Sequence, residues 1–331
     1  MKKAWLKKIS AAAIAALVLC TSSVCAAGAD KTESTGAENA VSASSESAAA
    51  LNYGDYAKLH SSALSGAQAA VGTPAKSDYL SDSALDRSGL LLSSSQREIE
   101  YEFDIADIGI YNIEIEYYAM PGKMKDIVFS VRTDGNLPFE EAEKISLSRI
   151  YADSGEIQRD QNGNDIRPSQ SEINRWNKEL LTGNDGYYDE AYGFYFDKAG
   201  KHKITLSYME EEMIVASVAL QPVTVLPTYD EYSKNAVKAE KTLTVFEAEK
   251  SLEKSSPMLY PTYDRSSAAT SPAHYSKIRY NTIGQSNWSH QGQWISWEIE
   301  VPSDGWYNLT LKSRQNYQQG VNSYRTLYID G

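Results

Sequence analysis

The sequence is poor in cysteine and histidine, and neither is placed where metal or redox chemistry would need it. Both cysteines, Cys20 and Cys25, fall within the first 27 of 331 residues. Removal of that segment leaves no cysteine, which excludes disulfides and thiolate metal sites. The histidines show no regular spacing and no His-Glu-x-x-His motif; the four are His60, His202, His274 and His290.

Basic runs and long apolar runs are missing as well. The formal net charge is −12, and the only charges in residues 1–27 are four lysines, so loss of that segment takes the net charge to −16. Such an acidic surface repels nucleic acid phosphates and anionic membranes. No later stretch approaches about 18 apolar residues, so we expect no membrane span after the N-terminal segment.

What the chain has in quantity is tyrosine. It contains 23 Tyr and 6 Trp against 6 Phe, with 42% apolar and 23% charged residues. This composition is that of a globular protein, and the length predicts about two domains. Rings with a polar edge are typical of strand surfaces and of faces that contact sugars.

The N-terminus has the features of an export signal. Four lysines from Lys2 to Lys8 precede the short apolar run 11–19, and the small residues Ala26 and Ala27 follow. Such a pattern predicts a signal peptide over residues 1–27, and its apolar run is too short to span a bilayer. Residues 28–50 are rich in Ser, Ala, Glu, Gly and Thr, which predicts a disordered linker.

A lipid anchor on one of the two cysteines is an alternative for this segment. Lipidation would need a small residue before the cysteine, whereas Leu19 precedes Cys20 and Val24 precedes Cys25. The sequence therefore favours a secreted protein, or one held at the extracellular face of the cell envelope.

The body of the chain shows strand periodicity. Apolar and acidic residues alternate over 99–105, and alternation resumes over 111–117 after Gly109. Each segment predicts a half-buried strand, and together they predict a hairpin-like pair. Short strands at such spacing predict an all-β fold of the sandwich type; further strands are expected at 127–131, 193–196, 203–208 and 213–220.

A repeat divides the chain. Shifted by 196 residues, the sequence places Ile99 on Ile295 and Gly109 on Gly305, with the alternation of both strands preserved. We therefore expect two tandem β-sandwich modules. The second lacks the later strands of the first, so we expect a fragment of a longer protein with an unpaired edge; the expected parts are a first module at 51–226, a linker at 227–243 and an incomplete second module at 244–331.

No motif for catalysis is present. The sequence lacks a G-x-S-x-G elbow, a phosphate-binding glycine loop and a dinucleotide fingerprint. Glycosidases need two carboxylates across a cleft, and the run 210–212 of three glutamates offers candidates. Carboxylates beside strands are far more often solvated, so we expect no enzymatic activity from these residues.

Two acidic groups could hold a hard cation such as Ca²⁺. Glu247 and Glu249 alternate, so on a strand both would point to one side. The loop 160–165 clusters oxygen donors, but its glycine stands at the fourth place and not at the sixth as in an EF-hand loop. Glu247 and Glu249 are the predicted structural calcium site. The loop 160–165 is a second candidate, which could instead be an ordinary Asn/Asp/Gly turn.

Rings and polar side chains gather between residues 260 and 317, including Tyr275, Tyr280, Trp294 and Tyr317. Sugars stack on rings while Arg and amide side chains hold their hydroxyls, so this composition suits a carbohydrate site. In contrast, core or barrel-end packing is expected for Trp297, Trp306 and Tyr307. The predicted sugar contacts are Tyr260, Tyr263, Arg265, Trp288, His290, Arg314 and Asn316.

Four segments of the second module resemble the galactose-binding-like β-sandwiches (jelly rolls) of carbohydrate-binding module families 6 and 35. In those families the two glutamates of the opening strand help to hold a structural Ca²⁺, which the resemblance places on Glu247 and Glu249. The first module departs from the pattern, with Ala67-Gln68-Ala69 in the corresponding place. The matching segments are 245–249 (Val-Phe-Glu-Ala-Glu), 292–297 (Gly-Gln-Trp-Ile-Ser-Trp), 301–309 and 327–331.

A longer resemblance covers nearly the whole chain after the signal and is carried by five segments. These segments are similar to the N-terminal region of large extracellular solute-binding proteins (family 1) of carbohydrate ABC transporters in Gram-positive bacteria, where lectin-like modules precede the solute-binding domain. The resemblance implies sugar recognition for uptake, and ABC-transporter permease subunits as partners. The segments are 134–140, 148–151, 158–168, 186–188 and 255–265.

Three functions remain open from the sequence. The first is non-catalytic binding of an oligo- or polysaccharide for an ABC transporter. The second is an accessory carbohydrate-binding module of a secreted glycoside hydrolase. The third is protein contact or spacing at the cell wall without sugar binding.

Overall fold

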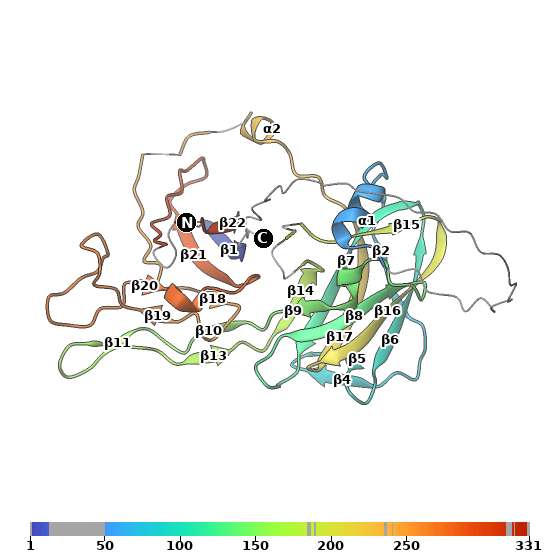
Figure 1. The fold of residues 1–331 in the computed structure, drawn as a ribbon, viewed down its shortest axis with the longest axis horizontal. Helices are drawn as coiled ribbons and strands as arrows, with labels where there is room; N and C mark the ends of the chain where they lie inside the picture. Colours follow the sequence, from blue (N-terminus) through green and yellow to red (C-terminus); the bar gives the residue numbers. More distant parts are fainter. Residues whose placement is uncertain are drawn as a thin grey trace, which may run out of the picture.

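The computed structural model describes residues 2–12, 50–183, 187–188, 190–234, 237–239, 241–315, 320 and 322–329, and for 2–12 only the backbone. The all-β prediction is confirmed: the first module is a sandwich of two antiparallel sheets (Figure 1). One sheet has the order β14 (Trp176–Leu180), β7 (Gly109–Ala119), β17 (Met213–Pro222), β5 (Arg87–Leu92) and β4 (Ser81–Ala84), with β15 (Gly193–Phe196) on β7 and β2 (Ala70–Val71) on β17.

The second sheet of the sandwich faces the first. Its order is β3 (Thr73–Pro74), β6 (Glu98–Ile105), β16 (Gly200–Glu210), β8 (Ile127–Thr133) and β9 (Ile145–Leu147). The predicted strands of this module are all present, with observed bounds that contain the predicted ones. The core between the sheets is formed by their alternate apolar side chains, as predicted for Ile99 and Ile113, both fully buried.

The predicted hairpin between 99–105 and 111–117 is wrong. β6 pairs with β3 and β16, whereas β7 pairs with β14, β15 and β17 in the other sheet. Residues 106–108 carry the chain from one sheet to the other. Alternation shows only which side of each strand is buried. Two strands in opposite sheets that both bury one side give the same sequence pattern as two paired strands of one sheet.

A short helix closes one end of the sandwich. α1 (Tyr53–Leu59) is capped by Asn52, whose side chain accepts from the backbone N–H of Asp55 at 2.9 Å. The hydroxyls of Tyr53 and Tyr56 accept hydrogen bonds from the backbone of β15, at 2.9 and 2.7 Å. Between β8 and β9 lies a 3₁₀ turn, η1 (Glu140–Glu143). The helix and the turn are local closures of an otherwise all-strand module.

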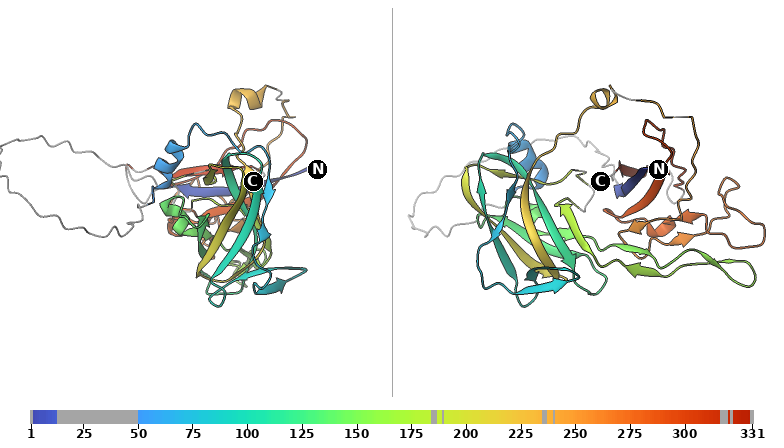
Figure 2. Two further views of the ribbon diagram at one scale, coloured as in Figure 1. Left: turned by 90° about the vertical axis from the view of Figure 1, so that its right-hand side faces the viewer. Right: turned by 180° about the vertical axis from the view of Figure 1, so that it is seen from behind.

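Between β9 and β14 the chain leaves the sandwich as a long two-stranded arm, which we define as residues 150–175. Its strands are β10 (Tyr151–Asp153), β11 (Gln158–Arg159), β12 (Asp165–Ile166) and β13 (Gln170–Glu172). Figures 1 and 2 show the arm running alongside the second module. There β10 pairs with β18 (Glu253–Lys254), so strands of both modules share one sheet.

A buried arginine fixes the base of this arm. The side chain of Arg149 is 0% exposed. It forms ion pairs with one carboxylate of the arm and one of the β16–β17 turn, and it donates to two backbone carbonyls. The contacts are Glu172 at 2.6 Å, Glu211 at 2.9 Å, the Lys125 carbonyl at 2.6 Å and the Met120 carbonyl at 2.9 Å.

The second module repeats part of the first. Its strands β18, β21 (Trp294–Val301), β1 (Lys2–Ala12) and β22 (Tyr324–Tyr328) form one sheet with β13 and β10 of the arm, in the order β13, β10, β18, β21, β1, β22. The succession β21, β1, β22 corresponds to β6, β16, β8 in the first module. A shift of 196 places β21 on β6 and β22 within β8. Smaller elements are β19 (Pro261–Thr262), β20 (Thr282–Ile283), η2 (Gln285–Asn287) and α2 (Tyr229–Ser233).

The two modules also begin alike. In the first, a capped helix is followed by a parallel bridge between Ser65 and Ile110, next to Gly109. In the second, α2 is followed by a parallel bridge between Lys238 and Trp306, next to Gly305. The φ angles of these two glycines are +157° and +150°. Much of the predicted linker 227–243 thus occupies the place that α1 and its following segment take in the first module.

One segment of the second module departs from the predicted repeat. Residues 307–313, expected to form the counterpart of β7, are irregular, and Leu309 and Leu311 are exposed. β7 is held by β14, β15 and β17, and the described part of the chain supplies no such partners to 307–313. The repeat also matches Asp134-Gly135 to Asp330-Gly331, and the latter pair lies outside the described residues.

The place of β16 in the second module is taken by β1, from the predicted signal peptide. Most of the predicted apolar run of the signal, both cysteines and almost all of the linker 28–50 lie outside the described residues. Cleavage of the signal remains a prediction. Within the described ranges, no helix is both long enough and apolar enough to cross a membrane.

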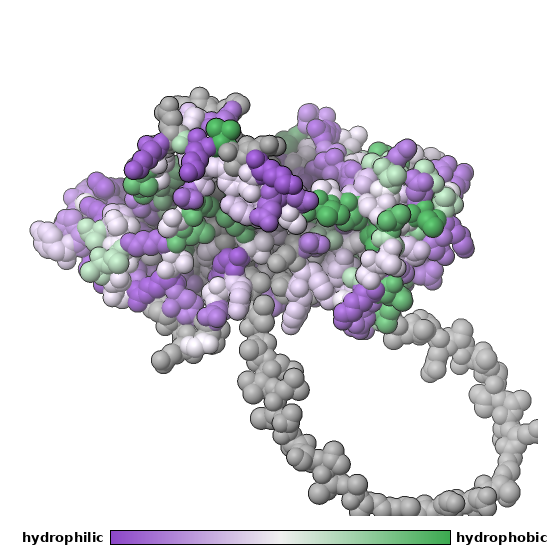
Figure 3. All heavy atoms as spheres, turned by 90° about the horizontal axis from the view of Figure 1, so that it is seen from above, coloured by the Kyte–Doolittle hydropathy of each residue, from purple (hydrophilic) through white to green (hydrophobic). Residues whose placement is uncertain are grey.

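The face in Figure 3 mixes hydrophilic and apolar side chains. Several apolar side chains between residues 225 and 246 are exposed, among them Val225, Leu226, Leu243 and Val245. Single exposed apolar residues are ordinary on a soluble surface, so this face is not assigned a role.

The Arg149 centre generates a stability prediction. Replacement by alanine (Arg149→Ala) leaves Glu172 and Glu211 without their buried partner, and we expect a loss of about 3–5 kcal/mol in the free energy of unfolding. Urea unfolding followed by fluorescence measures this. The control is Arg87→Ala, which removes a partly exposed pair with Glu116 and should cost less than about 1 kcal/mol. Equal losses in the two variants would contradict the assigned role.

Candidate functional site

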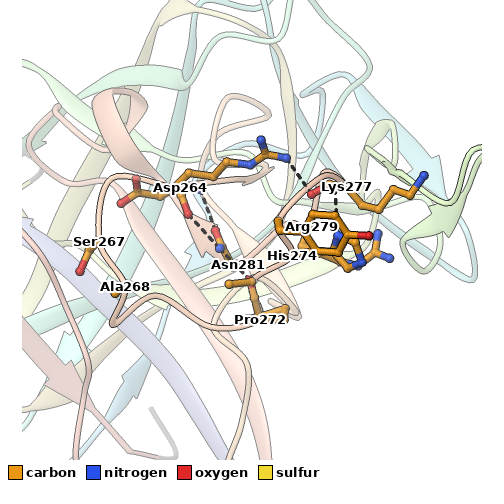
Figure 4. Close-up of a pocket in the computed structure, with 11 residues that line it drawn as sticks. Asp264, Ser267, Ala268, Pro272, His274, Lys277, Arg279 and Asn281 are labelled. Carbon is orange, nitrogen blue, oxygen red and sulfur yellow. Dashed lines mark hydrogen bonds between the residues drawn. The ribbon is translucent and has the colours of Figure 1, made fainter.

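One cavity in the second module is formed by a single loop, residues 264–281 (Figure 4). It has a volume of about 420 Å³. Polar, cationic and aromatic side chains line it together, which is the composition of a site for a polar ligand with apolar faces. The lining includes Asp264, Arg265, His274, Tyr275, Lys277 and Arg279.

Asn281 ties the two ends of this loop together. Its side-chain oxygen accepts from the backbone N–H of Asp264 at 2.8 Å, and its amide nitrogen donates to the carbonyls of Asp264 at 3.0 Å and Pro272 at 2.8 Å. The side chain is buried. These three bonds satisfy an amide that would otherwise be costly to bury, and they hold the mouth of the cavity at a fixed width.

His274 presents a defined hydrogen-bond donor. Its Nδ1 accepts from the backbone N–H groups of Ser276 and Lys277, each at 3.1 Å. The proton of the neutral ring therefore lies on Nε2, which can donate to a ligand. The ring is stacked on Tyr275, with centroids 4.7 Å apart and planes at 21°. Tyr275 is 94% exposed, so its outer face is open to solvent.

Three of the predicted sugar contacts lie at or beside this cavity. Arg265 lines it and donates to the carbonyl of Lys277 at 2.8 Å, and its guanidinium lies 5.8 Å from the ring centre of the exposed Tyr263. Arg314 pairs with Asp264 at 2.7 Å. Hydrogen bonds from Ser266 and the charge of Arg314 lower the pKa of Asp264. Arg314 thus balances the charge of a lining carboxylate.

Tyr260 has a different environment. The guanidinium of Arg167, on the arm of the first module, lies 3.9 Å from the centre of its ring. This is a cation–π contact at close range. That face of the ring is therefore covered by the neighbouring module.

Trp288 and His290 belong to a separate group before β21. The indole of Trp288 donates to the carbonyl of Gln293 at 3.2 Å and packs against the small core of the second module. Arg325 lies 4.7 Å from its ring centre. The backbone N–H of His290 donates to the side chain of Gln293 at 3.0 Å. The predicted contact Asn316, like Tyr317, lies outside the described residues.

The expected core residues behave as ordinary packing. Trp297 is buried, and its indole donates to the Ala248 carbonyl at 2.9 Å. Trp306 packs against the two tyrosines of α2, with ring centres 6.0 and 5.4 Å apart. The hydroxyl of Tyr307 donates to the Ser303 carbonyl at 2.8 Å. Trp297 is thus a core residue, whereas Trp306 and Tyr307 are half-buried and make packing or hydrogen-bond contacts within the module.

The two predicted calcium ligands do not lie on a strand, which corrects that part of the prediction. Residues 247–250 form a turn closed by a hydrogen bond from the Lys250 N–H to the Glu247 carbonyl at 3.0 Å. Glu249 is 3% exposed. Burial raises the pKa of Glu249, and the charges of Glu247 and Asp165 raise it further. The described residues contain no group of three or more Asp, Glu, His or Cys arranged to hold a metal ion.

The alternative metal loop 160–165 forms the tip of the arm, and its oxygen atoms are used by the protein. Asp160 accepts from the backbone N–H of Asn164 at 2.8 Å and from its side chain at 3.1 Å. Asp165 accepts from Arg279 at 3.1 Å and from the Tyr280 N–H at 3.0 Å. This arrangement is that of an Asn/Asp/Gly turn whose carboxylates serve protein contacts.

The glutamate run 210–212 also makes contacts within its own module. Glu210 pairs with Lys125 at 3.3 Å, Glu211 with Arg149, and Glu212 accepts from Ser94 at 3.3 Å. Each carboxylate thus has a partner in the turn region between β16 and β17.

Sequence reasoning missed several residues of the cavity. His274, Lys277, Arg279 and Asn281 were not predicted as ligand contacts, and Tyr275 was grouped with the other rings but not selected. The signal available was the dense polar and aromatic composition of 260–281. No spacing rule singles these residues out, because an irregular loop has no period.

Comparison with known proteins gives no family for this chain. No family model matches it, and no curated protein does. Eight solved chains match, at low similarity. The GH26-CBM35 β-(1,4)-mannanase of Podospora anserina is 13% identical, with 52% of this chain and 28% of that chain covered and a TM-score of 0.25.

Several other similar structures are α-1,3-glucanases. The catalytic domain of a GH87 α-1,3-glucanase in complex with nigerose is 15% identical, with 53% of this chain and 32% of that one covered and a TM-score of 0.28. The GH87 catalytic unit from Streptomyces thermodiastaticus is 16% identical, with 52% and 29% covered and a TM-score of 0.23. The chain thus spans about a third or less of each structure, and scores this low carry no argument about its fold or its function.

Proposed function

We propose that this chain is a non-catalytic carbohydrate-binding protein and that its second module binds the sugar in the 264–281 cavity. The observation that carries the proposal is the pairing, in one cavity, of an exposed ring with fixed hydrogen-bond donors. A pyranose offers an apolar C–H face and a rim of hydroxyls. Tyr275 can stack on that face, while His274 Nε2 and Arg265 can donate to hydroxyl oxygens.

The shape of the cavity agrees with an exposed sugar chain. It opens at the loop surface, with Tyr275 almost fully exposed at its rim. A site that lies on the surface can bind a stretch within a polysaccharide as well as the end of an oligosaccharide. The lining also carries one carboxylate, Asp264, which can accept from sugar hydroxyls.

The cellular setting of this proposal rests on the sequence. The signal-like residues 1–27 support export, and the motif resemblance supports a role in sugar capture for an ABC transporter, with permease subunits as partners. Signal-peptide cleavage and location at a Gram-positive cell envelope belong to the same proposal.

We also propose that Glu247 and Glu249 hold a structural Ca²⁺. The residues fit a hard cation, because Glu249 is a buried carboxylate with raised pKa and a second carboxylate nearby. A bound cation would offset both the desolvation and the mutual repulsion. Its contribution would be to stiffen residues 247–250, where the Ala248 carbonyl accepts from Trp297 of β21.

The sugar proposal is tested by removing the exposed ring. Tyr275→Ala should weaken binding by roughly tenfold, because stacking is lost while the fold is unchanged. Affinity gel electrophoresis with galactomannan, arabinoxylan, pectin and dextran measures the effect. Tyr187→Ala, which removes a 75% exposed tyrosine from the first module, is the matched control. If Tyr275→Ala binds as the wild type does, the cavity is not the sugar site. If the wild type binds none of the four polysaccharides, the sugar-binding proposal is rejected.

The calcium proposal predicts a linked dependence on pH and cation. The pKa of Glu249 is higher in the folded protein than in the unfolded chain, so near that pKa the folded protein binds more protons. Without Ca²⁺, the stability of the folded protein therefore falls as the pH rises through the folded-state pKa. In EDTA at neutral pH, Glu249→Gln should therefore melt at a higher temperature than the wild type. Addition of Ca²⁺ should raise Tm of the wild type and leave Glu247→Gln/Glu249→Gln unchanged.

Differential scanning calorimetry in EDTA and in Ca²⁺ measures both effects. Asp160→Asn is the control, since it alters the alternative acidic loop and should keep the full response to Ca²⁺. If the rise in Tm with Ca²⁺ is lost in Asp160→Asn and kept in Glu247→Gln/Glu249→Gln, the calcium site lies at the arm tip and the proposal is contradicted.

A further inference from the structure

We infer that the sugar site is shared between the modules: the tip of the first module's arm holds one wall of the 264–281 cavity, and Asp165 is the positioning residue. This inference rests on the proposed function of that cavity. It adds a residue from outside the second module, in a loop that the sequence suggested only as a turn or a metal site.

The key side chain of the wall is Arg279, which lines the cavity and is mostly buried. Its Nη1 donates to the Asp165 carboxylate at 3.1 Å and to the Gly163 carbonyl at 2.7 Å, both on the arm. It also donates to the Ile278 carbonyl at 2.8 Å. The position of this guanidinium is therefore set by acceptors from the other module.

The backbone of the wall is held by the same tip. The N–H of Tyr280 donates to Asp165 at 3.0 Å, and the N–H of Ile278 donates to the Asn164 side chain at 3.0 Å. In return, the N–H of Asp165 donates to the Ile278 carbonyl at 3.1 Å. Hydrogen bonds to a charged acceptor such as Asp165 are the stronger kind. Residues 278–280 thus receive from the arm the partners that a neighbouring strand would supply.

The tip is itself prepared for this contact. Asp160 holds Asn164 through two hydrogen bonds, at 2.8 and 3.1 Å, so the Asn164 side chain is oriented toward Ile278. These bonds lower the pKa of Asp160, which keeps it an acceptor. The turn passes through Gly163 at φ +74°, a conformation that glycine adopts without strain.

Coupling follows from this arrangement. The loop 264–281 is without helix or strand throughout, and its residues 278–280 are held by hydrogen bonds to the arm. Docking of the arm holds the wall in place for the sugar, and by linkage a bound sugar must favour the docked arm to the same degree. The two modules would then respond to ligand as one unit.

The test measures binding and backbone protection together. With the polysaccharide that retards the wild type most among galactomannan, arabinoxylan, pectin and dextran, Asp165→Asn should weaken binding about tenfold. In an Arg279→Gln background the same change should have a smaller further effect, because only the contact of Asp165 with the Tyr280 N–H remains to be weakened. Glu156→Gln removes an equal charge from an exposed position on the arm and should bind as the wild type does.

Hydrogen exchange followed by NMR gives the second reading. In Asp165→Asn the amides of Tyr280 and Ile278 should exchange faster than in the wild type, while those of β7 stay protected. Polysaccharide should slow the exchange of both amides in the wild type. Asn164→Ala, which removes the acceptor of Ile278 alone, should reproduce the faster exchange of that amide if Asp165→Asn fails to fold.

Each outcome decides between the two proposals. The shared wall would be overturned if the wild type binds and Asp165→Asn binds with the same affinity. It would also be overturned if the losses of affinity in Asp165→Asn and Arg279→Gln are additive. In both cases the cavity proposal would remain. Absence of binding by the wild type to all four polysaccharides would overturn both.

Discussion

The arrangement of the whole chain depends on one buried ion pair between its modules. Lys254 of β18 is 0% exposed, and its ammonium lies 2.7 Å from Asp153 of the arm. Burial lowers the pKa of Lys254, and the hydrogen bond and charge of Asp153 oppose that shift. A buried pair of this kind adds little net stability, but it strongly disfavours any arrangement in which one charge stays buried alone. It therefore selects one way of docking the arm.

Around that pair the contacts form a continuous series. Arg149 anchors the base of the arm in the sandwich, β10 pairs with β18 beside the ion pair, and Arg175 pairs with Glu253 through both of its terminal nitrogens. Farther out, the arm tip contacts the cavity wall, and the charge of Asp165 reaches the buried Glu249. The arm thus contacts both the sheet of the second module and the cavity wall.

The sequence predicted what is local and periodic. Alternation located β6, β7, β8, β15, β16 and β17 within a few residues but not β2 to β5, β9 or β14. The 196-residue repeat placed a strand at β21 by matching it to β6. It could not predict partners: β6 and β7 look like a hairpin but face each other across the core. The arm has too few alternating residues to be recognised, and its docking depends on Lys254, about 100 residues later in the chain. Tyr263, Arg265 and Arg314 were selected by residue type and lie at or beside the cavity, whereas Arg279 is positioned by contacts with the other module.

The central claim is that the arm joins the modules into one rigid unit, and residual dipolar couplings test it most directly. Amide couplings measured in the full chain for β6, β7 and β16, and for β18 and β21, should fit a single alignment tensor with the coordinates as they stand. Two tensors of different magnitude, one for each module, would mean that the modules reorient independently and would contradict the account.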